Sequence, residues 1–193
     1  LGVVQGLTEF LPVSSTGHLI LVRSLLGIEN VNGLAFDAIL HLATAAAVIV
    51  YFFPDIWQLT QAGLRKLGKL PVNKRDETLL YSLLIATIPA VVLGLLLESL
   101  MEETFRHPLL VAGVLIAGSL FFMYAEWVYR SQAQTNEMNV KKGFKFGLFQ
   151  TLALIPGMSR SGATISVGMI LGLSRSEAAR FAFLMAVPVI TGA

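Results

Sequence analysis

The chain has 193 residues, of which 55% are hydrophobic and 13% charged, and its mean hydropathy is +0.73. So few polar side chains cannot cover a water-soluble protein of this size, which excludes a soluble globular domain and predicts an integral membrane protein. The net charge of +2 gives no reason to expect a nucleic-acid partner, and the absence of cysteine excludes disulfides and thiol chemistry.

Apolar segments of two lengths follow one another along the chain. A transmembrane helix needs about 20 mostly apolar residues, and three segments reach this length: 34–53, 79–97 and 108–129. The shorter apolar segments are 1–12, 17–28, 143–155, 162–173 and a last one from 177 onward. We therefore expect one all-α polytopic membrane domain over 1–193. Because both ends of the sequence lie inside apolar segments, we also expect helical sequence beyond each end.

The loops between the long segments differ in charge. The segments 54–78 and 130–145 are rich in lysine and arginine, whereas 98–107 is mostly acidic. Basic loops usually face the cytoplasm, so the first two are predicted inside and the third outside.

The first two short apolar segments, 1–12 and 17–28, resemble the next two, 143–155 and 162–173. When the chain is shifted by 145 residues, the segment from Gly2 aligns without gaps on the segment from Gly147, and Gln5, Ser14 and Gly17 meet identical residues. Chance similarity between two apolar segments is the alternative explanation. The matching glutamine and the matching polar breaks favour an internal repeat.

Each copy predicts a re-entrant hairpin, since it reads as helix, polar break and helix with neither limb long enough to cross. The hairpins are 1–28 and 143–173, within repeats 1–129 and 143–193, and the second repeat lacks its C-terminal part. Three spans lie between them, so the hairpins open to opposite sides and the repeats are inverted in topology. Paired broken segments predict a binding site at mid-membrane.

The polar breaks carry side chains suited to an anion. The first break, FLPVSSTGHL, places hydroxyls directly before an apolar helix, where free backbone N–H groups point at the break. The second, PGMSRSG, adds a charged Arg160 at membrane depth, where ionisable residues are costly and usually functional. A guanidinium fits phosphate well. The predicted substrate-binding residues are Gln5, Ser14, Thr16, Ser159, Ser161 and Gly162; the alternative is that the serines only cap helices.

Candidate acid, base and nucleophile lie in the first hairpin. Glu9 follows Gln5 by one helical turn, and His18 begins the second limb. We predict a phosphoryl-transfer site in which Arg160 holds phosphate, Ser15 or His18 attacks or transfers a proton, and Glu9 orients a group or binds a metal. A divalent cation, Mg²⁺ or Ca²⁺, on Glu9 with Gln5 is the predicted cofactor. For His41 and Asp37, one turn apart, the alternatives are a place at the entrance to the site and a hydrogen-bonded pair at the membrane interface, and we expect the pair.

The segments QGLTEFLPVSSTGHL and PGMSRSGATISVGMILGLSR resemble the two signature motifs of the bacterial undecaprenyl pyrophosphate phosphatases of the bacitracin-resistance type. The resemblance covers most of the chain. It implies an integral membrane hydrolase that removes the terminal phosphate of a C55 polyprenyl diphosphate, recycling the lipid carrier for peptidoglycan synthesis and cell-wall biogenesis. It also implies roles for Glu9, Ser15, His18 and Arg160. Many members have glutamate where this sequence has Gln5, which leaves Glu9 as the only carboxylate here.

The resemblance implies a location in the cytoplasmic (inner) membrane of a bacterium, and two expectations follow from the inferred topology and the lipid substrate. We expect the site to be reached from the extracytoplasmic side, and the lipid tail to lie in a lateral apolar groove. A homodimer is an open alternative to a monomer. The competing function is a transporter or flippase for an anion or a polyprenyl phosphate lipid, because inverted re-entrant repeats also build secondary transporters.

Overall fold

The computed structural model describes residues 1–28, 33–104 and 108–191, and about 80% of these residues are helical. Within these ranges the only β-type pairing is a single bridge between Thr135 and Leu173. The elements in chain order are α1 (Gly2–Thr8), α2 (Ser15–Leu26), α3 (Gly33–Tyr51), α4 (Phe53–Leu67), α5 (Lys74–Thr104), α6 (Pro108–Arg130), α7 (Val140–Gln150), the 3₁₀ turn η1 (Thr151–Leu154), α8 (Arg160–Ile170) and α9 (Arg175–Thr191).

Two helices of the described residues are long and apolar enough to cross a membrane, over Lys74–Leu96 and Leu109–Arg130. These are the predicted spans 79–97 and 108–129. Large apolar side chains on them face outward, among them Leu95, Ile116 and Met123 at 73, 63 and 66% exposure. An apolar surface of this kind suits lipid contact, so the structure agrees with a membrane protein.

The predicted span 34–53 differs from expectation. It forms the 19-residue helix α3, whose part Ala35–Tyr51 has the length and hydropathy of a span only together with α4, and the two helices meet at a bend of 76°. The segment after it, read from sequence as a basic loop, begins instead with the helix α4. Pro54 explains this start, because proline in the first turn of a helix removes a donor that has no partner there.

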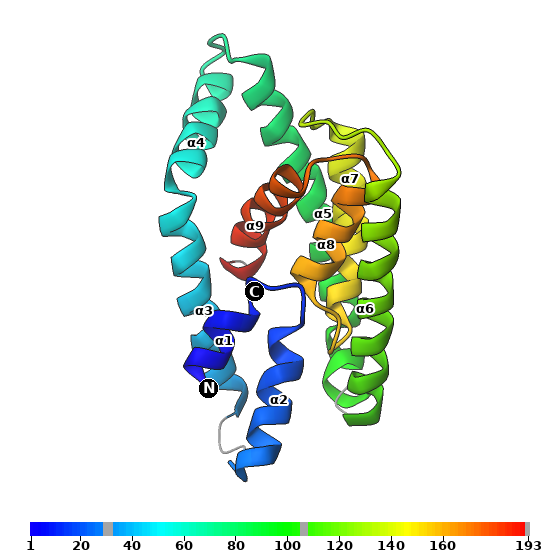
Figure 1. The fold of residues 1–193 in the computed structure, drawn as a ribbon. Coiled ribbons are helices and arrows are strands. Elements are labelled where there is room, and N and C mark those ends of the chain that lie inside the picture. Colours follow the sequence, from blue (N-terminus) through cyan, green and yellow to red (C-terminus); the bar gives the residue numbers. More distant parts are fainter. Residues whose placement is uncertain (29–32, 105–107, 192–193) are drawn as a thin grey trace.

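The two predicted hairpins are present as helix, break and helix. α1 and α2 flank the break at residues 9–14, while α7 and α8 flank η1 and the loop 155–159. In Figure 1 the two breaks lie near mid-height, α2 runs from its break to the bottom of the view, and α8 runs from its break toward the top. The loops 68–73 and 131–139, which belong to the predicted basic segments 54–78 and 130–145, lie toward the top. The predicted outer segment 98–107 falls partly outside the described residues.

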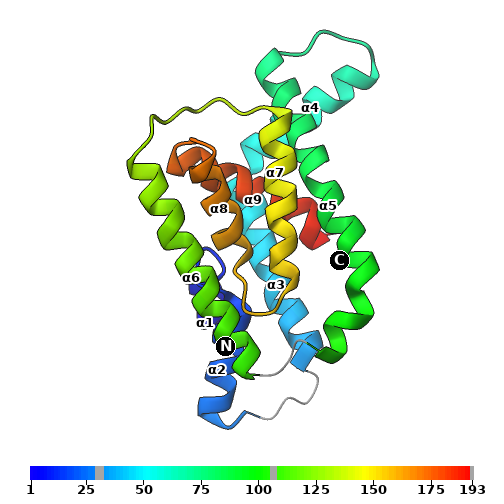
Figure 2. The ribbon, with the colours of Figure 1, turned by 90° about the vertical axis from the view of Figure 1, so that its right-hand side faces the viewer.

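Close packing of α7 on α5 holds the second hairpin in place, and Figure 2 shows the two helices side by side. A Cβ atom on Gly143 would lie 2.6 Å from the backbone oxygen of Ser82, and one on Gly147 would lie 2.4 Å from that of Ala86. Small residues four positions apart on both helices permit this approach. The core beside it is built from Phe146, Met169, Leu173, Phe181 and Met185.

Candidate active site

The tips of the two hairpins meet through an ion pair. Glu9, just after α1, accepts a hydrogen bond on Oε1 from Nη2 of Arg160, the first residue of α8, over 2.7 Å. The two side chains are 10 and 23% exposed. An ion pair with so little exposure stabilises the fold only when the other polar atoms of its two side chains also have hydrogen-bond partners. The sequence prediction that these two residues share one site is consistent with this contact.

The second oxygen of Glu9 collects donors from the first hairpin. Ser15 donates from Oγ to Glu9 Oε2 over 2.5 Å, and Gln5 donates from Nε2 to the same oxygen over 3.1 Å. Gln5 and Glu9 are one helical turn apart, which places them on one face of α1 and its extension. A serine hydroxyl bonded to a carboxylate is positioned to lose its proton to that carboxylate.

Serine caps start the second limb of each hairpin. Ser14 accepts from the backbone N–H of Gly17 over 3.4 Å, and Ser159 accepts from that of Gly162 over 3.0 Å. Ser14 has φ of 64°, a region that non-glycine residues rarely adopt and that costs about 1–3 kcal/mol. The strained residue immediately precedes Ser15, so the backbone is bent sharply where it presents that hydroxyl.

Polar contacts also join the two breaks directly. Ser161 donates from Oγ to the backbone oxygen of Leu11 over 3.2 Å and lies 3.1 Å from the hydroxyl of Ser159. Gly162 packs so closely that a Cβ atom there would lie 2.9 Å from Cβ of Ser159 and 3.4 Å from the backbone oxygen of Pro12. The two tips therefore touch without a layer of side chains between them.

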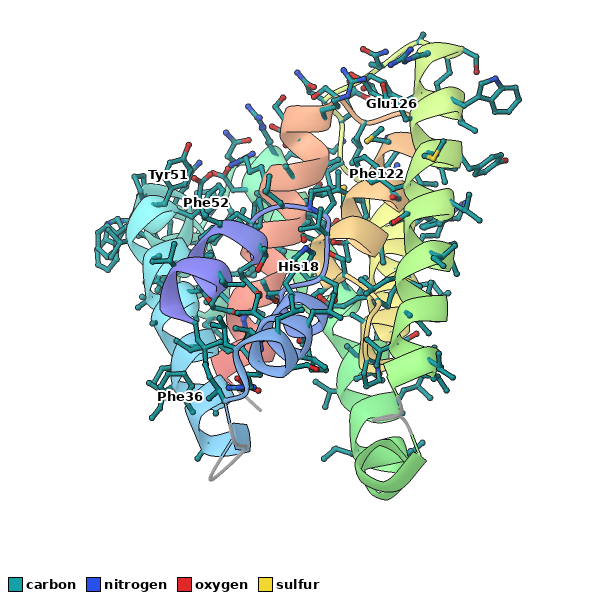
Figure 3. The ribbon with its side chains drawn as sticks, turned by 60° about the horizontal axis from the view of Figure 1, so that its bottom comes forward. His18, Phe36, Tyr51, Phe52, Phe122 and Glu126 are labelled. Atoms are coloured by element: carbon teal, nitrogen blue, oxygen red, sulfur yellow. The ribbon has the colours of Figure 1, made fainter. Side chains whose placement is uncertain are left out.

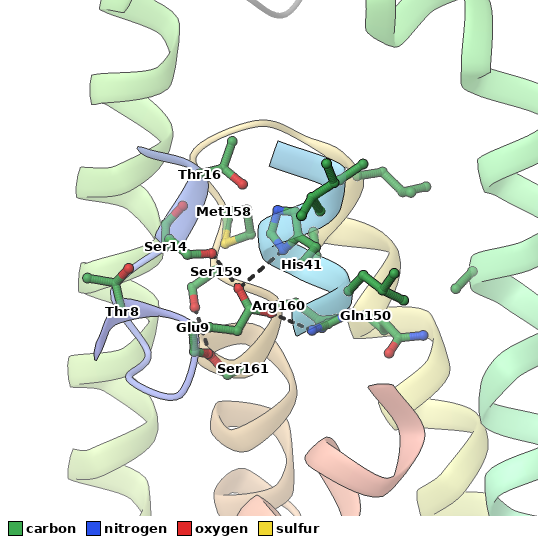
Figure 4. Close-up of a pocket in the computed structure, with 17 residues that line it drawn as sticks. Thr8, Glu9, Ser14, Thr16, His41, Gln150, Met158, Ser159, Arg160 and Ser161 are labelled. Carbon is green, nitrogen blue, oxygen red and sulfur yellow. Dashed lines mark hydrogen bonds and ion pairs between the residues drawn. The ribbon is translucent and has the colours of Figure 1, made fainter. Parts of the chain in front are cut away.

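A cavity of about 660 Å³ opens beside the ion pair (Figure 4). Seven predicted site residues line it: Glu9, Ser14, Ser15, Thr16, Ser159, Arg160 and Ser161. Thr8 lines it as well, whereas the predicted residues Gln5, His18 and Gly162 do not. Its apolar lining comes from α3, α5, η1 and the second break: Ala38, Ile39, Leu42, Ala90, Ala153, Leu154 and Met158. The cavity thus combines a charged end with an apolar wall, which suits an amphipathic ligand.

The histidines are arranged differently from the prediction. His18 lies in the first turn of α2 (Figure 3) and is half-buried, with its Nδ1 2.8 Å from the backbone oxygen of Ser14, and it is not among the residues that line the cavity. His41 does line it, with Nδ1 3.1 Å from Gln5 Nε2 and 3.6 Å from Glu9 Oε2.

The expected pair of His41 and Asp37 is wrong. Asp37 instead accepts two hydrogen bonds from Arg23 of α2, at 2.6 and 2.8 Å. A guanidinium binds a carboxylate through two parallel bonds, whereas an imidazole offers one. The charge of Arg23 is neutralised by this pair.

The donor set around Glu9 fits a divalent cation of the oxygen-binding kind. Gln5 Oε1 is buried and has no hydrogen-bond partner, and it belongs to the same side chain that contacts Glu9 Oε2. Mg²⁺ and Ca²⁺ take carboxylate and amide oxygens, and Mg²⁺ commonly needs only one or two carboxylates plus substrate phosphates. No cluster of three or more His, Cys, Asp or Glu side chains occurs in the described part of the chain.

The motifs, helices and cavity can be compared with known proteins. A family model described as bacitracin resistance protein BacA matches residues 1–193. The chain belongs to the BacA family. Among curated relatives, a protein named undecaprenyl-diphosphatase from Rubrobacter xylanophilus is 46% identical over 195 residues, with all of this chain and 72% of the relative covered. Proteins of the same name from Renibacterium salmoninarum and Alteromonas mediterranea are 43 and 42% identical over 193 residues, with all of this chain and 69 and 72% of each relative covered.

Three residues of the BacA cavity region were missed or undervalued by sequence reasoning: His41, Thr44 and Gln150. Thr44 Oγ1 lies 3.5 Å from Gln5 Nε2, and Gln150 lines the cavity. His41 was assigned to an interfacial pair with Asp37, and Thr44 lies on an otherwise apolar helix, where nothing in the sequence marks it. Gln150 did carry a signal, because it aligns with Gln5 at the offset of 145 residues.

Proposed function

We propose that this BacA chain hydrolyses undecaprenyl diphosphate to undecaprenyl monophosphate and inorganic phosphate. The curated relatives named undecaprenyl-diphosphatase support the substrate and the reaction. The observation that carries the proposal is the placement of Ser15, Glu9 and Arg160 on one cavity, with a hydroxyl 2.5 Å and a guanidinium 2.7 Å from the two oxygens of one carboxylate.

In the first step Ser15 is the nucleophile. Its proton passes to Glu9 Oε2, Oγ forms a bond to the terminal phosphorus, and the bond from that phosphorus to the bridging oxygen breaks. Arg160 holds the phosphoryl oxygens, which leaves Glu9 free to accept the proton. The lipid monophosphate leaves and takes the proton from Glu9, so that the carboxylate is restored.

In the second step a water molecule attacks the phosphoserine. Glu9 accepts one proton of this water, the bond between phosphorus and Ser15 Oγ breaks, and Oγ recovers the proton. Inorganic phosphate is released and the enzyme returns to its starting state. A divalent cation bound by Glu9 and Gln5 would neutralise charge on the diphosphate. His18 acts by holding the bent backbone at Ser14, which its ring nitrogen contacts.

The repeat and topology proposals have structural support. Repeat 1–129 and repeat 143–193 form one domain, and their hairpins share caps at the same offset of 145 residues: Ser14 with Ser159, and the positive-φ glycines Gly27 and Gly172. The opposite courses of α2 and α8 in Figure 1 support inverted topology. With the basic loops in the cytoplasm, the first hairpin opens outward, so we propose that substrate enters from the extracytoplasmic side of the inner membrane. A homodimer is compatible with this arrangement.

Phosphate release tests the function. Purified full-length protein in detergent is expected to release phosphate from undecaprenyl diphosphate, and Ser15→Ala, Glu9→Ala and Arg160→Ala are each expected to lower the rate by about 100-fold or more. Arg175→Ala is the matched control, because Arg175 pairs with Glu126 on the surface and is 55% exposed. Lipid movement across vesicles without phosphate release by the wild type would overturn the proposal in favour of a flippase.

A further inference from the structure

Gln150, the last residue of α7, is buried and has no polar partner. Its residue exposure is 2%, and neither Nε2 nor Oε1 has a hydrogen bond within the described residues. The same side chain lines the cavity that contains Glu9 and Arg160, and Figure 4 shows it on the α7 side of that cavity, beyond the arginine. An amide this deeply buried is therefore unpaired at the wall of the candidate active site.

An unpaired buried amide needs an explanation, since about 90% or more of buried polar groups are hydrogen-bonded. The carboxamide has two donor hydrogens and one acceptor oxygen. Gln5, which aligns with Gln150 in the repeat, shows the contrast: its Nε2 contacts Glu9 and His41, and only Oε1 is unpaired. Gln150 has no such partners among the described residues, so its donors are available to a ligand in the cavity.

The position of Gln150 is fixed by its helix. Gly147, three residues earlier, packs on Ala86 so tightly that a Cβ atom would lie 2.4 Å from the Ala86 oxygen. Thr151, the next residue, ends the helix, and its backbone N–H bonds to Leu148 and Phe149. The backbone of Gln150 is held in this way, and its side chain is buried, which leaves the amide little room to move. A preorganised donor binds its ligand at lower entropic cost.

We propose that Gln150 is a substrate-binding residue, whose Nε2 donates a hydrogen bond to a phosphoryl oxygen of the diphosphate group. The inference rests on the proposed function and extends it to Gln150, a residue that lies outside both signature motifs. Phosphoryl oxygens accept hydrogen bonds, so Nε2 of Gln150 faces the substrate. Its Oε1 accepts a hydrogen bond from a water molecule or a hydroxyl group beside the diphosphate. Arg160 binds the same headgroup from α8, and the two donors together fix its orientation.

Substitution by an apolar residue of similar length separates binding from folding. Gln150→Met removes the hydrogen-bonding groups and keeps the volume, so we expect the apparent KM for undecaprenyl diphosphate to rise at least tenfold, kcat to change less than threefold, and the unfolding midpoint to stay equal or rise. Gln150→Glu keeps the shape and adds a negative charge, and is expected to raise KM further by repelling phosphate.

Ser166→Ala is the matched control. Ser166 Oγ is also buried and unpaired, but it does not line the cavity. We expect this variant to leave KM unchanged. If Ser166→Ala raised KM as much as Gln150→Met, or if Gln150→Met left KM unchanged or lowered only kcat, the binding role of Gln150 would be wrong.

A second measurement keeps this inference separate from the proposed function. Methylenediphosphonate, which cannot be hydrolysed at its bridge, is expected to raise the unfolding midpoint of the wild type and of Ser166→Ala, and to raise it much less for Gln150→Met. If the wild type bound this probe but released no phosphate from undecaprenyl diphosphate, the proposed hydrolysis would be wrong. The shifts in unfolding midpoint would still test the binding role of Gln150. Equal shifts in wild type and Gln150→Met would overturn the inference.

Discussion

The carboxylate of Glu9 and the guanidinium of Arg160 lie 2.7 Å apart although 151 positions separate them in the chain. Each belongs to the tip of a different hairpin, so their contact exists only when both hairpins are folded and opposed. An incoming phosphate competes with Glu9 for the guanidinium. Substrate binding would thus engage Arg160 and, at the same time, release Glu9 to act on the hydroxyl of Ser15.

This ion pair is expected to couple the two hairpins energetically. Glu9→Gln, Arg160→Gln and the double variant form a cycle, and the coupling in unfolding free energy should be about 1–3 kcal/mol. Each single variant leaves one little-exposed charge without its partner, whereas the double variant does not. Reversible unfolding in mixed detergent measures the change in unfolding free energy of each of the three variants relative to the wild type. Additivity within about 0.5 kcal/mol would mean that the pair does not join the hairpins.

Gly162→Ala is expected to separate the hairpin tips. The added Cβ atom would lie 2.9 Å from Cβ of Ser159, so the Ser159 cap or the first break must shift. We expect phosphate release to fall by about tenfold or more, because misplacement of catalytic groups by 1 Å costs up to about 100-fold. Gly113→Ala on α6 is the control, since a Cβ there has nothing within 4 Å. Equal effects of the two variants would contradict the close contact at Gly162.

His41 is expected to act through a hydrogen bond near Glu9 that glutamine can replace. His41→Gln should keep phosphate release within about threefold of wild type, while His41→Leu should lower it by about tenfold, the effect of losing one hydrogen bond to a charged network. Steady-state rates of the two variants, with circular dichroism as a control for folding, check this. A leucine variant as active as wild type would remove His41 from the site.

Gln5→Glu tests the divalent cation. The new carboxylate would lie beside Glu9 Oε2, which Gln5 Nε2 contacts at 3.1 Å, and two adjacent carboxylates repel each other unless a cation lies between them. We expect the variant to lose more activity than wild type on chelation by EDTA, and to regain it at a lower Mg²⁺ or Ca²⁺ concentration. Identical metal titrations of both proteins would contradict a cation site at Glu9 and Gln5.

The parts of the structure that the sequence predicted are those with strong local signals. The spans 79–97 and 108–129 follow from hydropathy, and the hairpin breaks follow from proline, glycine and serine clusters that end and cap helices. The contact between Glu9 and Arg160 was predictable, because a charged side chain at membrane depth needs a partner of opposite charge and the sequence offers few.

The parts that the sequence did not predict depend on tertiary packing. The bend between α3 and α4 and the partner of Asp37 are set by neighbours that local patterns do not name. His41 was given an interfacial role because its own helix offers Asp37 one turn away, but Arg23 makes the better-matched pair. The unpaired amide of Gln150 is visible only when every buried polar group is examined for a partner.

The most direct test of the account is to look for phosphate on Ser15 during the first turnover. Full-length enzyme mixed with undecaprenyl diphosphate labelled with ³²P in its terminal phosphate, and quenched in acid within milliseconds, is expected to carry label on the peptide that contains Ser15. Ser15→Ala should carry none. Turnover by wild-type enzyme with no labelled protein at any quench time, or a Ser15→Ala variant that turns over at the wild-type rate, would contradict attack by Ser15.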